Sequence, residues 1–477
     1  IRDRIHSDSS RNEKEGLVTI DGAGQDGENG ASTERLDRNP HDDHTITAYP
    51  RLNDDSASVS ESRSLLAPAP VSFAVECTLP MSNTEVNADE ALQRFLTITA
   101  IPGRSGDEAA VAAKIIELLT AAGVSESQIV FDGAETRTRM DGNCGNLIVS
   151  LPGNGMGTRT VLSAHMDTVP SCVGSQPVVD GDEVHSGAPT GLGADDRGGC
   201  GAILTAIVER LQRGDENFPP AVISFLVQEE IGLEGARNLD ISQVGNVDRA
   251  FNFDGGTVEK LTVGAIGGER MSIELTGIPA HAGVAPEQGA SAIVMAARAI
   301  ADLDARGWLG KVEHDGESGT ANVGVIQGGE ATNVITPQLI LRAEARSHSA
   351  TMRSRIVNEI RQAFERAASE VTNHEGQAGS VDFDSHVDYE SFALAEDHPS
   401  IAAASDAVRK VGREPFAEIS NGGLDANWLF RLGIEAVTLG CGKRNIHTAD
   451  ERLVIADYLD ACRIATWLIT EGAGHEG

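Results

Sequence analysis

Two adjacent glutamates, Glu229 and Glu230, follow an apolar run at residues 221–227, with only Gln228 between. A short, uninterrupted apolar run is typical of a strand that is buried on both faces of a sheet. Two carboxylates at the end of such a strand repel each other and resist leaving water, and a bound cation relieves both costs. An isolated Glu-Glu pair is more often a solvated junction between strand and loop, so the rest of the chain has to decide.

Other histidine and acidic residues stand in similar positions. They follow predicted strands or precede a predicted helix in a glycine-rich turn: His165 with Asp167, the pair Asp195–Asp196, Asp254 and His447. In open α/β sheets, ligands gather outside the carboxyl ends of the strands. The glycine-rich turn lacks the phosphate-binding motifs, and its two aspartates would repel a phosphate. The set therefore predicts a metal site with carboxylate and imidazole ligands.

Strands and helices alternate along most of the chain, which is typical of an α/β fold whose sheet is flanked by helices. Strands are expected at 128–131, 146–151, 160–164, 221–227, 250–254 and 436–439, and helices at 88–96, 107–122 and 198–212. This pattern predicts an α/β domain in two parts, at residues 83–267 and 393–477, and the predicted metal site makes it the candidate catalytic domain.

Residues 268–392 show a different pattern. Strands are expected at 270–275, 321–326, 338–345 and 380–389, and helices at 290–305 and 350–371. The order β-α-β-β-α-β is that of a ferredoxin-like α+β sandwich. We therefore expect an inserted lid or dimerisation domain, because an exposed edge strand of a small sandwich is a surface for pairing.

Composition excludes several classes of partner. Residues 1–82 are rich in Asp, Ser, Asn, Arg and Gly, which predicts a disordered amino-terminal arm. A net charge of −34, with no basic stripe, argues against nucleic acid. No apolar stretch is long enough to cross a membrane. The six cysteines are scattered without a C-x-x-C motif, as in a cytoplasmic protein with reduced thiols.

Five sequence blocks carry a resemblance to a known family. They are His-Met-Asp-Thr-Val at 165–169, Gly-Ala-Asp-Asp-Arg-Gly-Gly at 193–199, Glu-Glu-Ile-Gly at 229–232, Phe-Asp-Gly-Gly at 253–256 and Asn-Ile-His-Thr at 445–448. In this order they resemble the di-zinc metallopeptidases of the aminoacylase, carboxypeptidase G and tripeptidase group, and most of all its peptidase T-like branch. The resemblance covers about residues 85 to 475.

The resemblance implies two divalent metal ions per chain, most often zinc, although cobalt or manganese also fits these ligands. His165 and Asp254 would hold one ion, Glu230 and His447 the other, and Asp195 would bridge both.

The same resemblance implies the catalytic residues. Glu229 would be the general base that moves a proton from water to the leaving amine. Asp167 would orient His165, and the peptide bond between Asp195 and Asp196 would be cis. Arg197, where many relatives have lysine, keeps the charge.

In the inserted domain, the resemblance points to three further residues. His281, in Gly-Ile-Pro-Ala-His-Ala-Gly at 277–283, would stabilise the oxyanion. Asn333 would bind substrate, and Arg346 would grip a substrate carboxylate, unless it forms a salt bridge between strands. Many relatives are homodimers through this domain, so a homodimer is expected.

The expected activity is hydrolysis of short peptides by an aminopeptidase of the tripeptidase type. In the family, the ligand at the Asp254 position tends to be Asp in aminopeptidases and dipeptidases, and Glu in carboxypeptidases and deacylases. The alternative enzyme is a deacylase or carboxypeptidase that acts on N-acyl amino acids. A catalytically dead binding protein is a weaker alternative, because this chain keeps every ligand and the base.

Overall fold

The computed structural model describes residues 85–154, 156–212 and 218–470. The amino-terminal arm predicted at residues 1–82 lies outside this described part of the chain. Among the described residues, no helix is long and apolar enough to cross a membrane.

A nine-stranded mixed sheet forms the centre of the larger body, in the order β1-β2-β6-β3-β7-β16-β8-β14, with β15 beside β8. Its strands are β1 (Ile129–Phe131), β2 (Leu147–Leu151), β3 (Thr160–His165), β6 (Ala221–Leu226), β7 (Arg249–Gly255), β8 (Lys260–Ala265), β14 (Phe392–Ala393), β15 (Phe416–Ser420) and β16 (Ala436–Gly440). The four central strands β6, β3, β7 and β16 run parallel. Their carboxyl ends therefore meet at one edge.

The central strands are covered on both faces. All residues of β3 and β6 are buried, including Phe225, and this explains why the run at 221–227 is almost entirely apolar. The helices of this body are α1 (Ala88–Thr99), α2 (Ala109–Ala122), α3 (Ala194–Gln212), α8 (Pro399–Lys410) and α10 (Ile455–Thr470), with the short α4 (Glu234–Arg237), α5 (Ile241–Val244) and α9 (Ala426–Arg431). Helix α3 packs against β3 and β7, and α8 packs against β7 and β16.

A small side sheet supports the loops around the site. Its order is β17-β18-β5-β4, with β4 (Pro177–Asp180), β5 (Glu183–Ser186), β17 (Lys443–Arg444) and β18 (Arg452–Val454). Single 3-10 turns lie at η1 (Glu126–Gln128), η2 (Ala134–Thr136) and η3 (Pro170–Cys172). The sequence did not predict this sheet, because its strands have two to four residues and are largely exposed or polar.

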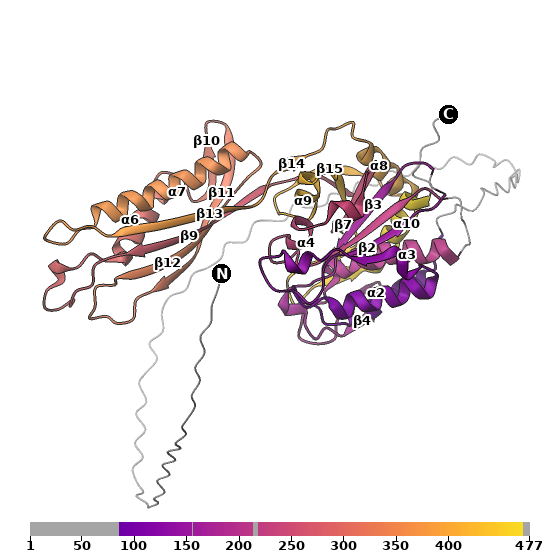
Figure 1. Cartoon of the computed structure of the whole chain (residues 1–477), viewed down its shortest axis with the longest axis horizontal. Helices are drawn as coiled ribbons and strands as arrows, with labels where there is room; N and C mark the ends of the chain where they lie inside the picture. Colours follow the sequence, from indigo (N-terminus) through magenta and orange to yellow (C-terminus); the bar gives the residue numbers. More distant parts are fainter. Residues whose placement is uncertain (1–84, 155, 213–217, 471–477) are drawn as a thin grey trace, which may run out of the picture. The chain divides into compact units, whose positions relative to one another are not determined.

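The inserted segment forms a second sheet with a hydrophobic core of its own. Its order is β10-β11-β12-β9-β13, with β9 (Gly267–Thr276), β10 (Gly310–His314), β11 (Glu317–Gly328), β12 (Gln338–Ser347) and β13 (Ser380–Tyr389). Helices α6 (Ala292–Ala305) and α7 (Ala350–Glu370) lie together on one face of this sheet (Figure 1), and η4 (Pro286–Gln288) precedes α6.

The predicted fold class is confirmed, since both the helix-flanked mixed sheet and the α+β sandwich are present. The expected order of the inserted segment was incomplete by one strand. Edge strand β10 was missed because Val312 is its only buried side chain. The exact limits of the domains stay a prediction.

Candidate metal centre

Asp195 lies at the centre of the predicted ligands. It precedes the regular part of α3, and its peptide bond to Asp196 is cis, as the resemblance implied. Its Oδ1 atom lies 3.2 Å from Nε2 of His165, and its Oδ2 atom lies 3.3 Å from Nε2 of His447. The two oxygens of one carboxylate thus face two different histidines.

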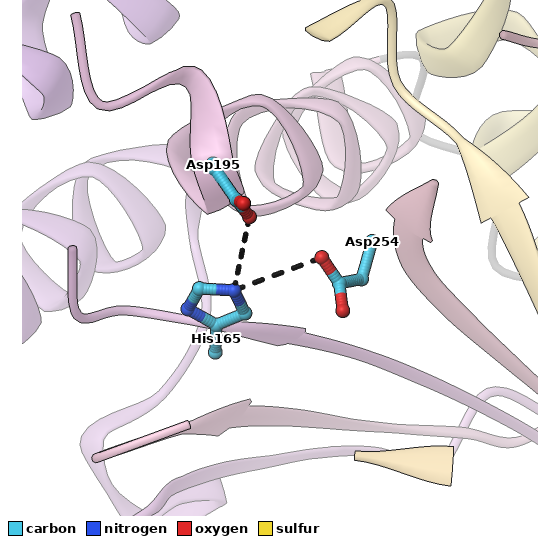
Figure 2. A group of neighbouring side chains, drawn as sticks. All are labelled: His165, Asp195 and Asp254. Carbon is cyan, nitrogen blue, oxygen red and sulfur yellow. Dashed lines mark hydrogen bonds and ion pairs between the residues drawn. The ribbon is translucent and has the colours of Figure 1, made fainter. Parts of the chain in front are cut away.

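The first group of ligands consists of His165, Asp195 and Asp254 (Figure 2). His165 is the last residue of β3, and Asp254 lies near the end of the neighbouring strand β7. Nε2 of His165 points at both carboxylates and lies 3.7 Å from Oδ1 of Asp254. One potential ligand atom from each residue lies within 4.8 Å of the other two.

The second group consists of Asp195, Glu230 and His447. Glu230 lies in the loop after β6, and His447 lies in the loop after β17, the short strand that follows β16, so loops beyond the carboxyl ends of parallel strands bring these residues together. Nε2 of His447 lies 3.0 Å from Oε1 of Glu230. Hydrogen bonds to Asp195 and Glu230 raise the pKa of His447 to about 10.

Asp167 connects His165 with the two glutamates. Its carboxylate is fully buried and lies 3.4 Å from Nδ1 of His165. The backbone N–H groups of Glu229 and Glu230 donate to Asp167 at 3.0 and 3.2 Å, and the Ser105 hydroxyl donates at 2.6 Å. Asp167 therefore fixes the orientation of the imidazole and the position of the Glu-Glu pair at the same time.

Glu229 lines the same cleft as the ligands and is half-buried. Burial raises the pKa of its carboxyl group well above the ordinary value; His165 opposes this increase, and Asp254 adds to it. A raised pKa suits a group that accepts and returns a proton near neutral pH. Among the described residues, the cleft has a volume of about 770 Å³ and is also lined by Arg270, Arg346 and Tyr389 of the inserted segment.

Lys443 was not predicted to belong to the site. Its side chain is 4% exposed, and its Nζ atom donates to Oδ1 of Asp195 at 2.5 Å and to Oδ1 of Asp254. Burial by itself would lower the pKa of Lys443, but Asp195, Asp254 and Asp196 raise it well above the ordinary value. For Asp195 the directions are reversed. Burial by itself would raise the pKa of this carboxyl group, but Lys443 and the histidines hold it well below the ordinary range.

Glu451 also escaped the sequence analysis. Its buried carboxylate accepts hydrogen bonds from the backbone N–H groups of Gly193 (2.7 Å) and Asp195 (3.0 Å). It thereby fixes the turn that carries Asp195. The sequence offered one signal for this residue. Glu451 stands four residues after His447, close enough along the chain for its carboxylate to reach the same site.

Arg197 has a structural position beside the site. Its guanidinium is buried and donates to the backbone carbonyls of Ile98 and Gly103, at 2.9 and 3.1 Å. It joins α1 and the following loop to α3. Its charged group therefore stabilises the packing of these elements rather than binding a ligand.

The three residues expected from the inserted segment lie apart from the ligand groups. His281 and Asn333 are exposed and adjacent to each other, since the N–H of Ala282 donates to the carbonyl of Asn333 at 2.9 Å. In the described part of the chain, neither belongs to the residues that line the cleft. Arg346 does line the cleft, but its guanidinium forms two 3.0 Å hydrogen bonds with Glu344.

The donor atoms fit divalent cations. Two imidazole groups and three carboxylates are the ligand types that zinc, cobalt and manganese accept. The group of Asp195, Glu230 and His447 fits without change, while the first group fits once Lys443 leaves the two aspartates.

Comparisons with known proteins agree with this arrangement. Residues 161–471 match peptidase family M20/M25/M40. The uncharacterized protein YqjE of Bacillus subtilis is 31% identical, over 81% of this chain and 100% of its own length. The solved structure of the aminopeptidase PepT from Bacillus cereus is similar, with a TM-score of 0.71 and 30% identity over 82% of this chain and 100% of that one. A tripeptidase structure from Staphylococcus aureus gives a TM-score of 0.72 and 29% identity, over 81% and 99%.

Proposed function

Because this chain belongs to peptidase family M20/M25/M40, we propose that it is a two-metal aminopeptidase that releases the first residue of short peptides. Membership of the family confirms the resemblance seen in the five sequence blocks and makes the chain a metal-dependent peptide hydrolase. The aminopeptidase and tripeptidase named among the similar structures support the direction of cleavage.

The observation that carries the proposal is the position of Asp195. One of its oxygens belongs to the group with His165 and Asp254, and the other belongs to the group with Glu230 and His447. These five side chains would hold two divalent cations on either side of one carboxylate. Two such cations would polarise the scissile carbonyl and lower the pKa of the attacking water.

Glu229 is the proposed general base. Its carboxyl group lies in the cleft beside both ligand groups, where it could take a proton from water and return it to the leaving amine. Asp167 is the proposed positioning residue, since it contacts His165 and holds the backbone of Glu229 and Glu230.

Arg346 supports an exopeptidase that acts on short substrates. Its guanidinium lines the cleft, and a peptide carboxylate could replace Glu344 as its bidentate partner. The distance from the metal ligands to Arg346 would then limit the length of the peptide to about three residues, because both ends of the substrate are bound.

His281 and Asn333 are proposed to bind the substrate carbonyl and backbone only after the inserted domain closes. Both are exposed and outside the set of residues described around the cleft, so the site is complete only after such a movement. We also propose that the inserted domain mediates a homodimer and that the enzyme acts in the cytoplasm.

A hydrolysis screen tests the proposed function. The protein is loaded with Zn²⁺, Co²⁺ or Mn²⁺ and given free tripeptides, the same tripeptides with acetylated amino groups, and N-acyl amino acids. We expect the free tripeptides to be cleaved fastest, with release of the first residue. Faster cleavage of the acetylated peptides or of the N-acyl amino acids would replace the aminopeptidase by a deacylase.

A further inference from the structure

Lys443 occupies the position of a cation in the first ligand group. Its Nζ atom contacts Oδ1 of Asp195 and Oδ1 of Asp254, which are the same two oxygen atoms that face Nε2 of His165 (Figure 2 shows these three partners). It also lies 3.7 Å from Oδ1 of Asp196. The ammonium group is therefore surrounded by three carboxylates.

An ammonium group and a divalent cation cannot share this position. Bonds from zinc to carboxylate oxygen and imidazole nitrogen are about 2.0–2.2 Å long. The Lys443 nitrogen is 2.5 Å from Oδ1 of Asp195 and contacts Asp254 as well, so it fills the space that such a cation needs. The two positive charges would in addition repel each other at this separation.

The second ligand group is free of this conflict. Glu230, His447 and Oδ2 of Asp195 face one another, and the described contacts of Lys443 are with the other oxygen of Asp195. Only in the group that contains Asp254, therefore, must the ammonium group of Lys443 leave before a metal ion can bind.

The backbone of Lys443 is held in place. Lys443 belongs to β17, which pairs with β18 through Leu453, and the carbonyl of Lys443 accepts a hydrogen bond from Arg444 at 3.0 Å. Movement of this residue away from the aspartates thus falls to its side chain, which has four rotatable bonds and borders the cleft.

We propose that Lys443 is an intramolecular competitor for the metal subsite of His165, Asp195 and Asp254, so that the subsite of Glu230 and His447 binds its ion first and more tightly. This inference rests on the proposed two-metal function. It adds an order of filling, in which Lys443 neutralises Asp195 and Asp254 until the second ion displaces its ammonium group into the cleft.

Calorimetric titration of the metal-free protein with Zn²⁺ tests the order of filling. The wild type should show two unequal binding steps. Lys443→Met removes the charge while keeping a side chain of similar length, and it should tighten the weaker step by about tenfold or more, which corresponds to ~1.4 kcal/mol per tenfold. The tighter step should change much less, since Glu230 and His447 have no described contact with Lys443 and Asp195 faces this subsite with its other oxygen.

Two further variants guard against a folding defect. Lys443→Gln removes the charge but keeps a polar side chain, and it should change the weaker step in the same direction. Lys260→Met is the matched control, because Lys260 lines the same cleft but pairs with Glu418 at 3.1 Å. This control should leave both steps unchanged.

The subsite is identified in a His447→Ala background, which removes a ligand of the other group. Only one binding step should remain there, and adding Lys443→Met should tighten it by the same factor. Unchanged affinities in Lys443→Met and in Lys443→Gln would overturn the competition while leaving the two-metal function standing. A wild type that binds no metal at this site would instead overturn the proposed function itself.

Discussion

The candidate functional side chains at the carboxyl ends of the central strands differ in burial from those of the inserted segment. At the strand ends, His165, Asp167 and Asp195 are buried and hydrogen-bonded to one another and to the backbone. In the inserted segment, His281 and Asn333 are exposed. The side chains proposed for the chemical step are thus already held in place, whereas those proposed to bind the substrate are not.

This difference has a physical reason. Buried carboxylates are tolerable only with fixed partners, so the ligand groups need a rigid framework before any substrate arrives. Groups that surround a substrate must let it enter and leave, and exposure with few contacts permits this movement. Substitutions in the two regions should therefore separate loss of chemistry from loss of substrate contacts.

The largest effect is expected from Glu229→Gln. The amide cannot accept the proton from water, so kcat should fall by at least about a hundredfold. The metal content should remain at two ions per chain, because Glu229 is not among the proposed ligands. Elemental analysis together with steady-state kinetics checks both statements, and a rate like that of the wild type would reject Glu229 as the base.

His281→Ala comes next. If His281 stabilises the oxyanion after closure, kcat should fall by about a hundredfold, as for other single oxyanion donors. Metal affinity and the unfolding temperature should not change, since the exposed side chain has its described hydrogen bond only with Gly283. His374→Ala, which alters another exposed histidine of the same segment, is the control. Equal activities of the two variants would remove His281 from the mechanism.

Arg346→Lys should have a smaller effect that depends on the substrate. The loss of the bidentate fork should raise KM about tenfold for tripeptides, and kcat should change little. Peptides with an amidated carboxyl terminus should lose much less, because they offer no carboxylate. Arg342→Lys on the same strand is the control, since Arg342 is exposed. An equal loss for both kinds of peptide would show that Arg346 serves only its salt bridge with Glu344.

The smallest effect concerns stability and pH. Burial, and then the charge of Asp167, raise the pKa of Glu108 to about 7, from 4.5. Between these values the folded state holds a proton that the unfolded state has released, so stability falls as pH rises from 4.5 to 7. Glu108→Gln keeps an acceptor for the N–H groups of Gly106 and Gln228 but removes this titration.

Urea unfolding of the metal-free protein at several pH values between 5 and 8 measures the difference. The free energy of unfolding of Glu108→Gln, relative to the wild type, should increase with pH up to about 7 and then stay constant. The exposed Glu126→Gln serves as the control. A constant difference over the whole range would mean that Glu108 titrates alike in both states.

The ligand positions were predictable because each follows an apolar run whose end had to lie at the edge of a sheet. The structure places His165 and Asp254 at the ends of β3 and β7, Glu230 in the loop after β6, and His447 in the loop after β17, the short strand that follows β16. Their roles stay predictions, but their proximity no longer depends on the pattern alone. The long elements were also readable: β13 was expected at 380–389, where it is found, and α7 was expected at 350–371 and ends at Glu370.

The position of Lys443 beside the candidate ligands could not be predicted from the sequence pattern. A lysine four residues before a ligand usually points to water, and only the pairing of β17 with β18 turns this one toward Asp195 and Asp254. The pairing itself involves two residues of β17, too few for a period-two pattern. Contacts that arise from tertiary folding of short segments leave no local signature in the sequence.

The position of β16 in the sheet has a consequence for biosynthesis. Strands β7 and β8 are close in sequence, but β16 lies between them and leaves the ribosome much later. From the end of β8 at Ala265 to the start of β16 at Ala436, translation takes roughly 10–30 s at the usual rates. During this interval the inner edges of β7 and β8 have no partner, and such edges bind other chains readily. We therefore expect these edges to need protection in the nascent chain until β16 emerges, and the proposed metal subsite that uses His447 cannot form before then.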